Sequence, residues 1–189
     1  MGTNRTRDQI VEAADQLFYR QGFEYTSFAD IAAAVQISRG NFYHHFKSKD
    51  EILDAVIELR LENTRKMLAQ WEREAATPAE RIRSYIRIVI ANRSKIKRYG
   101  CPVGTLCTEL AKLNHLSRRG ANKVFTLFRD WLGNQFQQLG RGEDADRMAM
   151  HVLAWSQGVA TMANAYRDEA FMRWEVSQIN AWLDQYTDN

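Results

Sequence analysis

Apolar residues recur every three to four positions along most of this chain, the spacing that places them on one face of an α-helix. From Thr6 to Gln21 the apolar positions are Ile10, Ala14, Leu17 and Phe18. The same period predicts helices over about 27–35, 38–45, 48–68, 78–90, 106–113, 121–139, 143–167 and 171–186. No segment of useful length shows the period of two that is typical of a strand. The pattern therefore predicts an all-α fold of about nine helices.

Residues that start and stop helices divide the first fifty positions into short segments. Gly22 follows the first apolar run and predicts a helix end at a C′ glycine. Ser27 and Asp30 have the spacing of a capping box with Asp in the acidic position, and Ser48 and Glu51 have the S-x-x-E form. We therefore expect three short helices, followed by a long helix that starts near residue 48.

The second and third of these helices, joined by a turn of about three residues, form a helix-turn-helix pattern. The segment SRGNFYHHFKSK, residues 38–49, carries cations, histidines and aromatic residues and no acidic residue. Arg39 and Asn41 have the hydrogen-bonding groups that recognise guanine and adenine edges, and Gly40 lets a backbone approach DNA closely. Tyr43, His45 and Lys49, together with Lys47, are suitable partners for phosphates. The segment therefore predicts a recognition helix for the major groove of double-stranded DNA.

The segment TSFADIAAAVQISRGNFYHHFKSKDEIL resembles the DNA-binding motif of the tetracycline-repressor (TetR) family. The residues that match the family pattern are Thr26, Ile31, Ala32, Ser38, Gly40, Tyr43, His45, Phe46, Lys49 and Leu53. One departure is Gln36, because many members have glycine in this turn; if the turn is left-handed, a non-glycine residue costs of the order of 1 kcal/mol. The resemblance implies a homodimeric, ligand-responsive regulator, most often a repressor, that binds a palindromic operator.

The resemblance also implies roles for individual residues and regions. Thr26, Ser38, Tyr43, His45 and Lys49 would hold phosphates, and Arg39, Asn41 and His44 would face bases; Ser27, at the start of the second helix, is counted with them. Residues 1–48 would form the DNA-binding domain, and residues 49–189 the effector-binding and dimerisation domain. An apolar effector cavity would be lined by Tyr85, Val89, Phe125, Phe128, Trp131, Trp155 and Met162.

The helix expected over 143–167 has a stripe of small residues beside its large apolar ones, and small residues let helix axes approach each other. With apolar residues of the last helix, this stripe predicts a dimer interface made of Ala154, Gly158, Thr161, Ala165, Val176, Ile179 and Leu183. The alternative is that the stripe packs against another helix of the same chain.

Cys101 lies in the segment YGCPVG, before an expected helix start and close to Arg98, and both features lower the pKa of a thiol. The segment resembles the start of the ligand domain in a subgroup of TetR-type regulators, some of which sense electrophiles or oxidants through a cysteine. Cys101 is therefore a candidate sensor of an electrophile or oxidant. The alternative is a small apolar residue in a tight corner.

The bulk composition limits the remaining classes. The chain has 189 residues, 45% of them hydrophobic and 26% charged, with a net charge of +3. No run is long enough to span a membrane, no signal peptide is evident, and two cysteines fit a reducing cytoplasm. No catalytic, metal-binding or phosphate-cradling motif is present, so we expect neither an enzyme nor a cofactor. The alternatives are a thiol-dependent helical oxidoreductase that uses Cys101 and Cys107, and a helical protein-interaction adaptor without DNA binding.

Overall fold

The computed structural model describes residues 2–187, except for the side chains of residues 2–4 and 39. Within this range the secondary structure is entirely helical, with ten helices and no strand. Helices α5 (Pro78–Ala91) and α6 (Arg93–Tyr99) are separated only by Asn92, so counting them as one interrupted helix gives nine. The expected all-α fold of about nine helices is confirmed. None of the described helices is both long and apolar enough to cross a membrane.

The chain forms two compact units, and each unit is built from two separate stretches of the sequence. The first unit comprises residues up to 63 together with 105–124, and the second comprises 64–104 and 125–189. Helices α4 (Lys49–Glu74), α7 (Pro102–Lys112) and α8 (Arg118–Gln138) contribute residues to both units. The functional boundary expected after residue 48 stays a proposal, because compactness alone does not define a functional domain.

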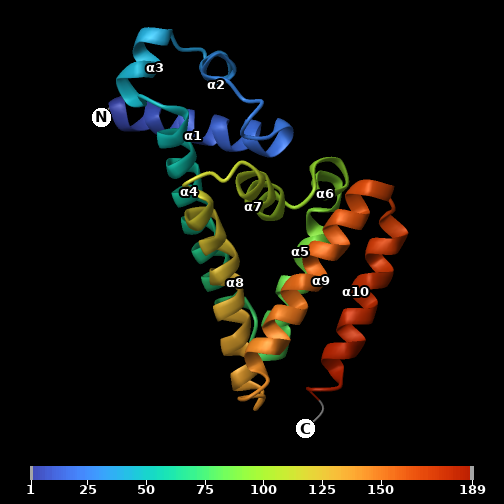
Figure 1. The fold of residues 1–189 in the computed structure, drawn as a ribbon. Coiled ribbons are helices and arrows are strands. Elements are labelled where there is room, and N and C mark those ends of the chain that lie inside the picture. The colour runs from blue at the N-terminus through green and yellow to red at the C-terminus, as the bar shows by residue number, and fades with distance from the viewer. Residues whose placement is uncertain (1, 188–189) are drawn as a thin grey trace. The chain divides into compact units, whose positions relative to one another are not determined.

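The first unit contains α1 (Gly2–Gln21), α2 (Phe28–Ala34) and α3 (Arg39–His45), which follow one another around a small core (Figure 1). The apolar positions that predicted these helices form much of that core. Its buried side chains include Ile10, Ala14, Phe18, Ile31, Phe42, Phe46, Ile52, Leu53 and Val56. Burial of such side chains stabilises a fold by about 1.5–3 kcal/mol each.

Local signals determine the helix ends of the first unit. Gly22 has φ +93°, as expected for a glycine after a helix end. Ser27 and Asp30 form the complete capping box, and the hydrogen bonds from Ser27 lower the pKa of Asp30. Gln36 has φ +56°, so the turn is left-handed and carries the strain expected of a non-glycine residue.

The second capping box differs from the expectation in one hydrogen bond. The hydroxyl of Ser48 accepts from the amide of Glu51 at 3.1 Å, as expected. The carboxylate of Glu51, however, accepts from the amide of Lys47 at 2.7 Å. The side chain therefore reaches one residue further back and binds the end of the loop that precedes α4.

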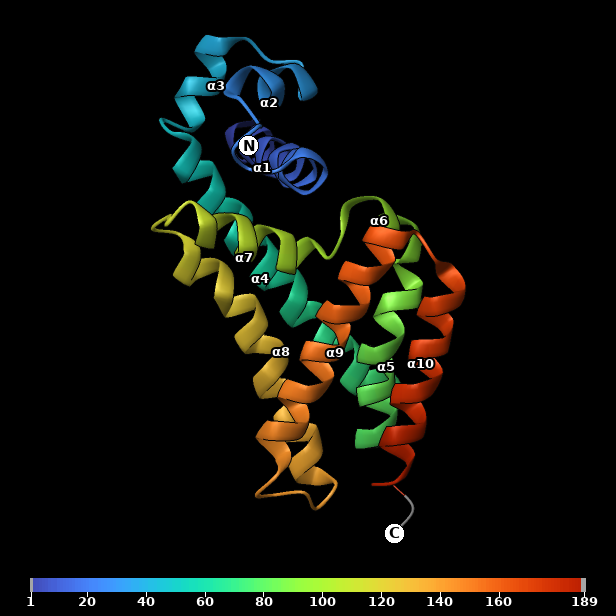
Figure 2. The ribbon, with the colours of Figure 1, turned by 45° about the vertical axis from the view of Figure 1, so that its right-hand side comes forward.

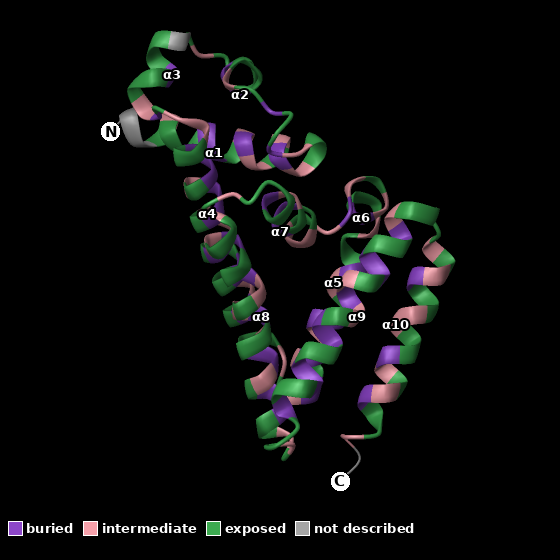
Figure 3. Ribbon diagram, in the orientation of Figure 1, coloured by how far each residue is buried: buried purple, intermediate pink, exposed green. Residues whose placement is uncertain are grey.

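The second unit contains α5, α6, α9 (Ala145–Tyr166) and α10 (Glu169–Asp184), together with parts of α4 and α8. Helix α10 packs along α5 and α9, and α6 packs against α9 (Figure 2). Figure 3 shows that buried and exposed residues alternate along α9 and α10. The buried side chains between these helices include Ile82, Ile86, Val89, Val152, Val159, Ala160, Met172, Ile179 and Leu183.

Ion pairs join α6 to the first turn of α10. Glu169 pairs with Lys97 and Arg93 of α6, each at 3.0 Å, and with Arg173 one turn along α10 at 2.6 Å. Hydrogen bonds from Lys97 and then Arg173 lower the pKa of Glu169 to about 2. The basic side chains of Arg93 and Lys97 are thus used in intramolecular ion pairing.

Candidate nucleic-acid interface

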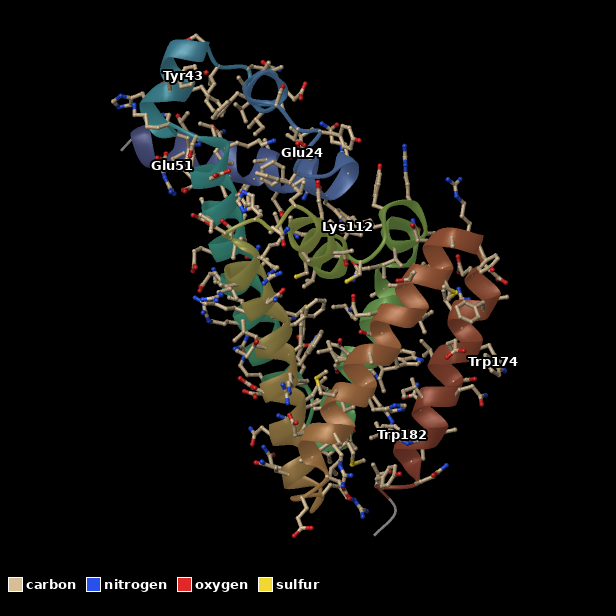
Figure 4. All side chains as sticks on the ribbon, in the orientation of Figure 1. Glu24, Tyr43, Glu51, Lys112, Trp174 and Trp182 are labelled. Atoms are coloured by element: carbon tan, nitrogen blue, oxygen red, sulfur yellow. The ribbon has the colours of Figure 1, made fainter. Side chains whose placement is uncertain are left out.

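Helix α3 is anchored by aromatic side chains and exposes a polar face. The hydroxyl of Ser38 caps the helix by accepting from the amide of Asn41 at 3.3 Å. Phe42 is 1% exposed and Phe46 is 2% exposed, so both belong to the core. Asn41, directly before Phe42, is exposed, and so is Tyr43, directly after it. Tyr43 is labelled in Figure 4. Burial of the anchors therefore turns the predicted recognition residues outward.

Tyr43 is held in place although it lies at the surface. Its side chain is 47% exposed, and its ring lies 5.5 Å from that of Phe28 on α2 and 6.3 Å from that of Phe42. The ammonium of Lys47 donates a hydrogen bond to the carbonyl of Tyr43. These contacts order the phenol before any ligand binds, which reduces the entropy lost on binding.

The start of α3 leaves room for close approach. Gly40 is exposed, and a Cβ added there would meet no atom of the chain within 4 Å. His44 is exposed and His45 is half-buried, with their rings 5.5 Å apart in an edge-to-face arrangement. The side chain of Arg39, which we predicted to face a base, lies outside the described part of the chain.

Thr26 does not have the geometry of a phosphate partner. It is 1% exposed, and its hydroxyl donates to the carbonyl of Gly22 at 2.6 Å while accepting from the side-chain amide of Gln21 at 3.3 Å. The expectation is therefore corrected: Thr26 stabilises the turn between α1 and α2 from within. The hydroxyl of Ser27 is exposed but donates to Asp30 at 2.7 Å in the capping box.

Lys49 also has an intramolecular role that the sequence did not reveal. Its ammonium donates to the carbonyls of Phe23 at 3.0 Å and Glu24 at 3.2 Å, and lies 4.3 Å from the centre of the Phe23 ring. This cation bridges α4 to the turn between α1 and α2. We therefore interpret Lys49 mainly as a residue that positions the turn, and only secondarily as a phosphate partner.

Sequence reasoning missed Tyr25, which is 82% exposed two residues before Ser27. A tyrosine in a turn between helices is a signal of surface function, because an aromatic ring outside any apolar period has no core position to fill. Tyr25 lies in the turn before α2, and a phenol hydroxyl is one of the groups that bind phosphates.

The seven predicted effector residues do not share one environment in the second unit. The hydroxyl of Tyr85 hydrogen-bonds to that of Ser156 at 2.9 Å, and the Tyr85 ring packs edge-on against Phe128 at 5.2 Å. Burial raises the pKa of this phenol. Trp131 donates to Glu72 at 2.9 Å, Val89 is core, and Phe125 is half-buried.

Met162 is the clear exception among these seven residues. It is 41% exposed on α9, so the expectation that it lines an interior cavity is wrong. Trp155, which packs against the core around Val89, also borders the same surface groove as Met162.

Cys101 lies at the start of α7. Its sulfur accepts a hydrogen bond from the amide of Gly104 at 3.4 Å, which is the geometry of a capping side chain. The residue is half-buried, whereas Cys107 is buried, and neither forms a disulfide.

The small-residue stripe of α9 is exposed. Ala154, Gly158, Thr161 and Ala165 all face away from the core of the second unit, and a Cβ at Gly158 would meet no atom of the chain within 4 Å. A shallow groove of about 510 Å³ follows the stripe and is lined by Trp155, Gln157, Gly158, Val159, Thr161, Met162, Phe171 and Glu175. The stripe is therefore available for contact with a partner and does not pack within its own unit.

The α10 part of the predicted dimer interface needs correction. Ile179 is 4% exposed and Leu183 is 0% exposed, because both side chains pack into the core of their own unit. Val176 is half-buried. Trp174, by contrast, is 58% exposed and extends away from α10, whereas Trp182 lies toward α9 (Figure 4). The exposed apolar surface of α10 is thus on the Trp174 side.

Two protein-family signatures match the chain. Residues 10–56 match the signature described as bacterial regulatory proteins, tetR family. Residues 78–176, more than half of the chain, match the signature described as transcriptional regulator LmrA/YxaF-like, C-terminal domain. The first covers the helix-turn-helix and the second covers α5 to the first half of α10.

Individual relatives agree with these signatures. The chain is 23% identical to the HTH-type transcriptional repressor DhaR of Mycobacterium sp. (strain GP1), over 98% of this chain and 90% of that protein. It is 26% identical to the HTH-type transcriptional regulator LmrA of Bacillus subtilis (strain 168), over 81% and 82% of the two chains. The fold matches the TetR-family regulator SCO4454 of Streptomyces coelicolor with a TM-score of 0.85 at 18% identity, over 98% of this chain and 97% of that one.

Proposed function

Because the chain belongs to the TetR family of bacterial regulatory proteins, we propose that it represses transcription by binding a palindromic DNA operator as a homodimer and releases the operator when a small effector binds. The assignment as a DNA-binding transcriptional regulator follows from the family. The residues and the mechanism proposed below rest on the geometry of this chain. Its relative DhaR carries the name of a repressor, which supports the proposed sign of regulation.

The observation that carries the proposal is the exposed face of α3. Phe42 and Phe46 anchor the helix from below, so Gly40, Asn41 and Tyr43 project from the other side. A major groove about 12 Å wide accepts a helix presented in this way. The first unit thus presents a helix with exposed polar side chains, and with the backbone accessible at Gly40, to the edges of the bases.

The residues proposed to contact DNA fall into two chemical groups. Asn41 has the amide that can donate to and accept from adenine, and Arg39 has the guanidinium that suits guanine. Tyr43 and His45 offer groups that bind phosphate oxygens, and Ser38 and His44 complete the exposed set around them. We assign base recognition to Asn41, Arg39 and His44. We assign contacts with the DNA phosphates to Tyr43, His45 and Ser38.

Pairing is required because one helix-turn-helix reads only a few base pairs. The exposed stripe of α9, with the groove beside it, offers the self-complementary small-residue surface that a two-fold interface needs. Two copies joined in this way would present two α3 helices to successive turns of the duplex.

The effector is proposed to act in the second unit, near Tyr85 and Phe128. The Tyr85 hydroxyl and its Ser156 partner form a buried polar pair among apolar side chains, which suits an apolar molecule with one polar group. The effector would bind one arrangement of the two helix-turn-helix domains more tightly than the arrangement that binds the operator. A difference of about 1.4 kcal/mol between its two binding free energies is enough to lower operator affinity tenfold. An electrophile that reacts at Cys101 remains the second candidate.

A binding experiment with the full-length chain tests the proposal. Duplexes recovered by selection from a random pool are titrated at two salt concentrations, and the selected site is footprinted. We expect a palindromic footprint and an affinity that falls steeply with salt, because bound phosphates release counterions. Failure to bind any duplex at low salt would contradict the proposal and favour an adaptor or a thiol-dependent enzyme.

A further inference from the structure

The turn between α1 and α2 is held by side chains from distant parts of the first unit. The carboxylate of Glu109, on α7, accepts from the amide of Phe23 at 3.0 Å and from the amide of Glu24 at 2.8 Å. The ammonium of Lys49, on α4, donates to the carbonyls of the same two residues. Both the donors and the acceptors of this short stretch are therefore bound by charged groups, and such hydrogen bonds are stronger than neutral ones.

Two further features show that this clamp is built closely around the turn. Gly22 has φ +93°, which favours glycine, and a Cβ there would lie 3.0 Å from a carboxylate oxygen of Glu109, so it would push the carboxylate back by a few tenths of an ångström. The Phe23 ring is 3% exposed and packs edge-on against Phe18 at 5.3 Å and against His115 at 5.1 Å. The turn is thus fixed through its backbone and through its side chain.

A continuous set of contacts connects this turn to the recognition helix. The hydroxyl of Thr26 binds the carbonyl of Gly22, and the next residue caps α2. Phe28, the first residue of α2, packs against Phe42 at 5.2 Å and against Tyr43 at 5.5 Å. A shift of the turn would therefore move the start of α2, and with it the aromatic contact that orients α3.

We propose that Glu109 is a positioning residue for DNA recognition, because its carboxylate fixes the turn from which α2 and then α3 take their orientation. The inference rests on the proposed function and adds a residue that does not touch DNA. Glu109 lies on α7, outside the helix-turn-helix, and its negative charge would repel phosphates. Its contribution to specific binding is therefore indirect, through the orientation of α3 and hence of Asn41, the residue assigned to the bases.

The test compares Glu109→Gln and Glu109→Ala with the wild type on a duplex selected from a random pool with the wild-type chain. Glu12→Gln is the matched control, because Glu12 is an exposed carboxylate on α1 and its change alters net charge equally. We expect Glu109→Ala to weaken specific binding by at least about tenfold, which is about 1.4 kcal/mol. Glu109→Gln should weaken it less, because its amide keeps one acceptor oxygen. Binding to random duplex should change no more than it does in Glu12→Gln.

Two additional readouts separate positioning from a general loss of stability. Hydrogen exchange at the amides of Phe23 and Glu24 should accelerate in both Glu109 variants while the amides of α9 stay protected. The effects of Glu109→Gln and Asn41→Ala on specific binding should be non-additive, because both act on the base contacts made by α3. If Glu109→Ala does not fold, Glu109→Gln provides the decisive comparison.

The outcomes distinguish this inference from the proposed function. If the Glu109 variants bind the selected duplex as tightly as the wild type does, the positioning role is overturned and the proposed function stays intact. Equal losses on selected and random duplexes would also overturn it. A wild-type chain that binds no duplex would remove the proposed function itself.

Discussion

Replacing Gly40 by alanine should raise the stability of the protein and lower its affinity for DNA. Gly40 is the second residue of α3, and a Cβ there meets no atom of the chain within 4 Å. Alanine in a helix is favoured over glycine by about 0.5–1 kcal/mol. Because α3 has only seven residues and Gly40 lies near its start, we expect the lower value, about 0.5 kcal/mol, which corresponds to a rise in Tm of about 1–2 °C for a chain of this size.

The same methyl group should be harmful in the complex. If the backbone at Gly40 lies against the duplex, an added Cβ must displace α3 from the groove, and we expect specific affinity to fall about tenfold. Thermal unfolding measures the change in stability, and fluorescence anisotropy of a labelled duplex measures the change in affinity, both in the same buffer. Gly133→Ala on α8 is the matched control, because its Cβ would also meet nothing within 4 Å and it lies outside the recognition helix. A Gly40→Ala variant that binds the selected duplex like the wild type would refute close approach at this position.

Further predictions concern recognition, acid stability and pairing. Asn41→Ala should change base preference in a selection experiment, whereas Tyr43→Ala should weaken selected and random duplexes alike; identical behaviour of the two variants would refute the division of roles. The pKa of Glu169 is lowered to about 2, so its contribution to stability is fully present above its ordinary pKa of 4.5 and is lost as the pH falls towards 2. Denaturant unfolding of Glu169→Gln should therefore show a deficit against the wild type at pH 7 that shrinks at pH 3; a deficit independent of pH would contradict the ion-pair argument. Gly158→Leu should shift the sedimentation coefficient from dimer to monomer, and an unchanged dimer would exclude the α9 stripe as the interface. Cys101→Ser should abolish any loss of operator binding on alkylation, and an equal loss in both proteins would exclude Cys101 as the sensor.

The helix-turn-helix was predictable because its signals are local. The caps at Ser27 and Ser38 depend on residues three positions away, and helical period alone identifies Phe42 and Phe46 as core. The left-handed turn at Gln36 was also visible as a departure from glycine. For these caps and core positions, whose contacts span only one or two helical turns, the local sequence contains the information that is required.

The errors at Lys49, Ile179 and Leu183 arose because periodicity and composition do not identify the partner of a residue elsewhere in the chain. Lys49 had the composition of a phosphate ligand, but its acceptors are the carbonyls of residues 23 and 24, and no local pattern indicates that pairing. Ile179 and Leu183 belong to an apolar seam that could face either a partner or the chain's own core, and periodicity does not distinguish these two cases. Glu109 was not considered at all, because its acceptor role depends on amides 85 and 86 positions away.

The charge distribution around the helix-turn-helix gives a physical reason to expect that operator binding needs two copies of the chain. The ammonium groups of Lys47 and Lys49 bind carbonyls within the first unit, and Arg60 pairs with Asp15 at 2.6 Å. Carboxylates such as that of Glu51 lie nearby, so the net field that attracts phosphates is small for one copy. Non-specific affinity depends on the number of phosphates neutralised, so a single copy would bind weakly at physiological salt. We therefore expect the exposed stripe of α9 to be as necessary for operator binding as α3 is, because pairing through it would double the contacts without adding a basic arm.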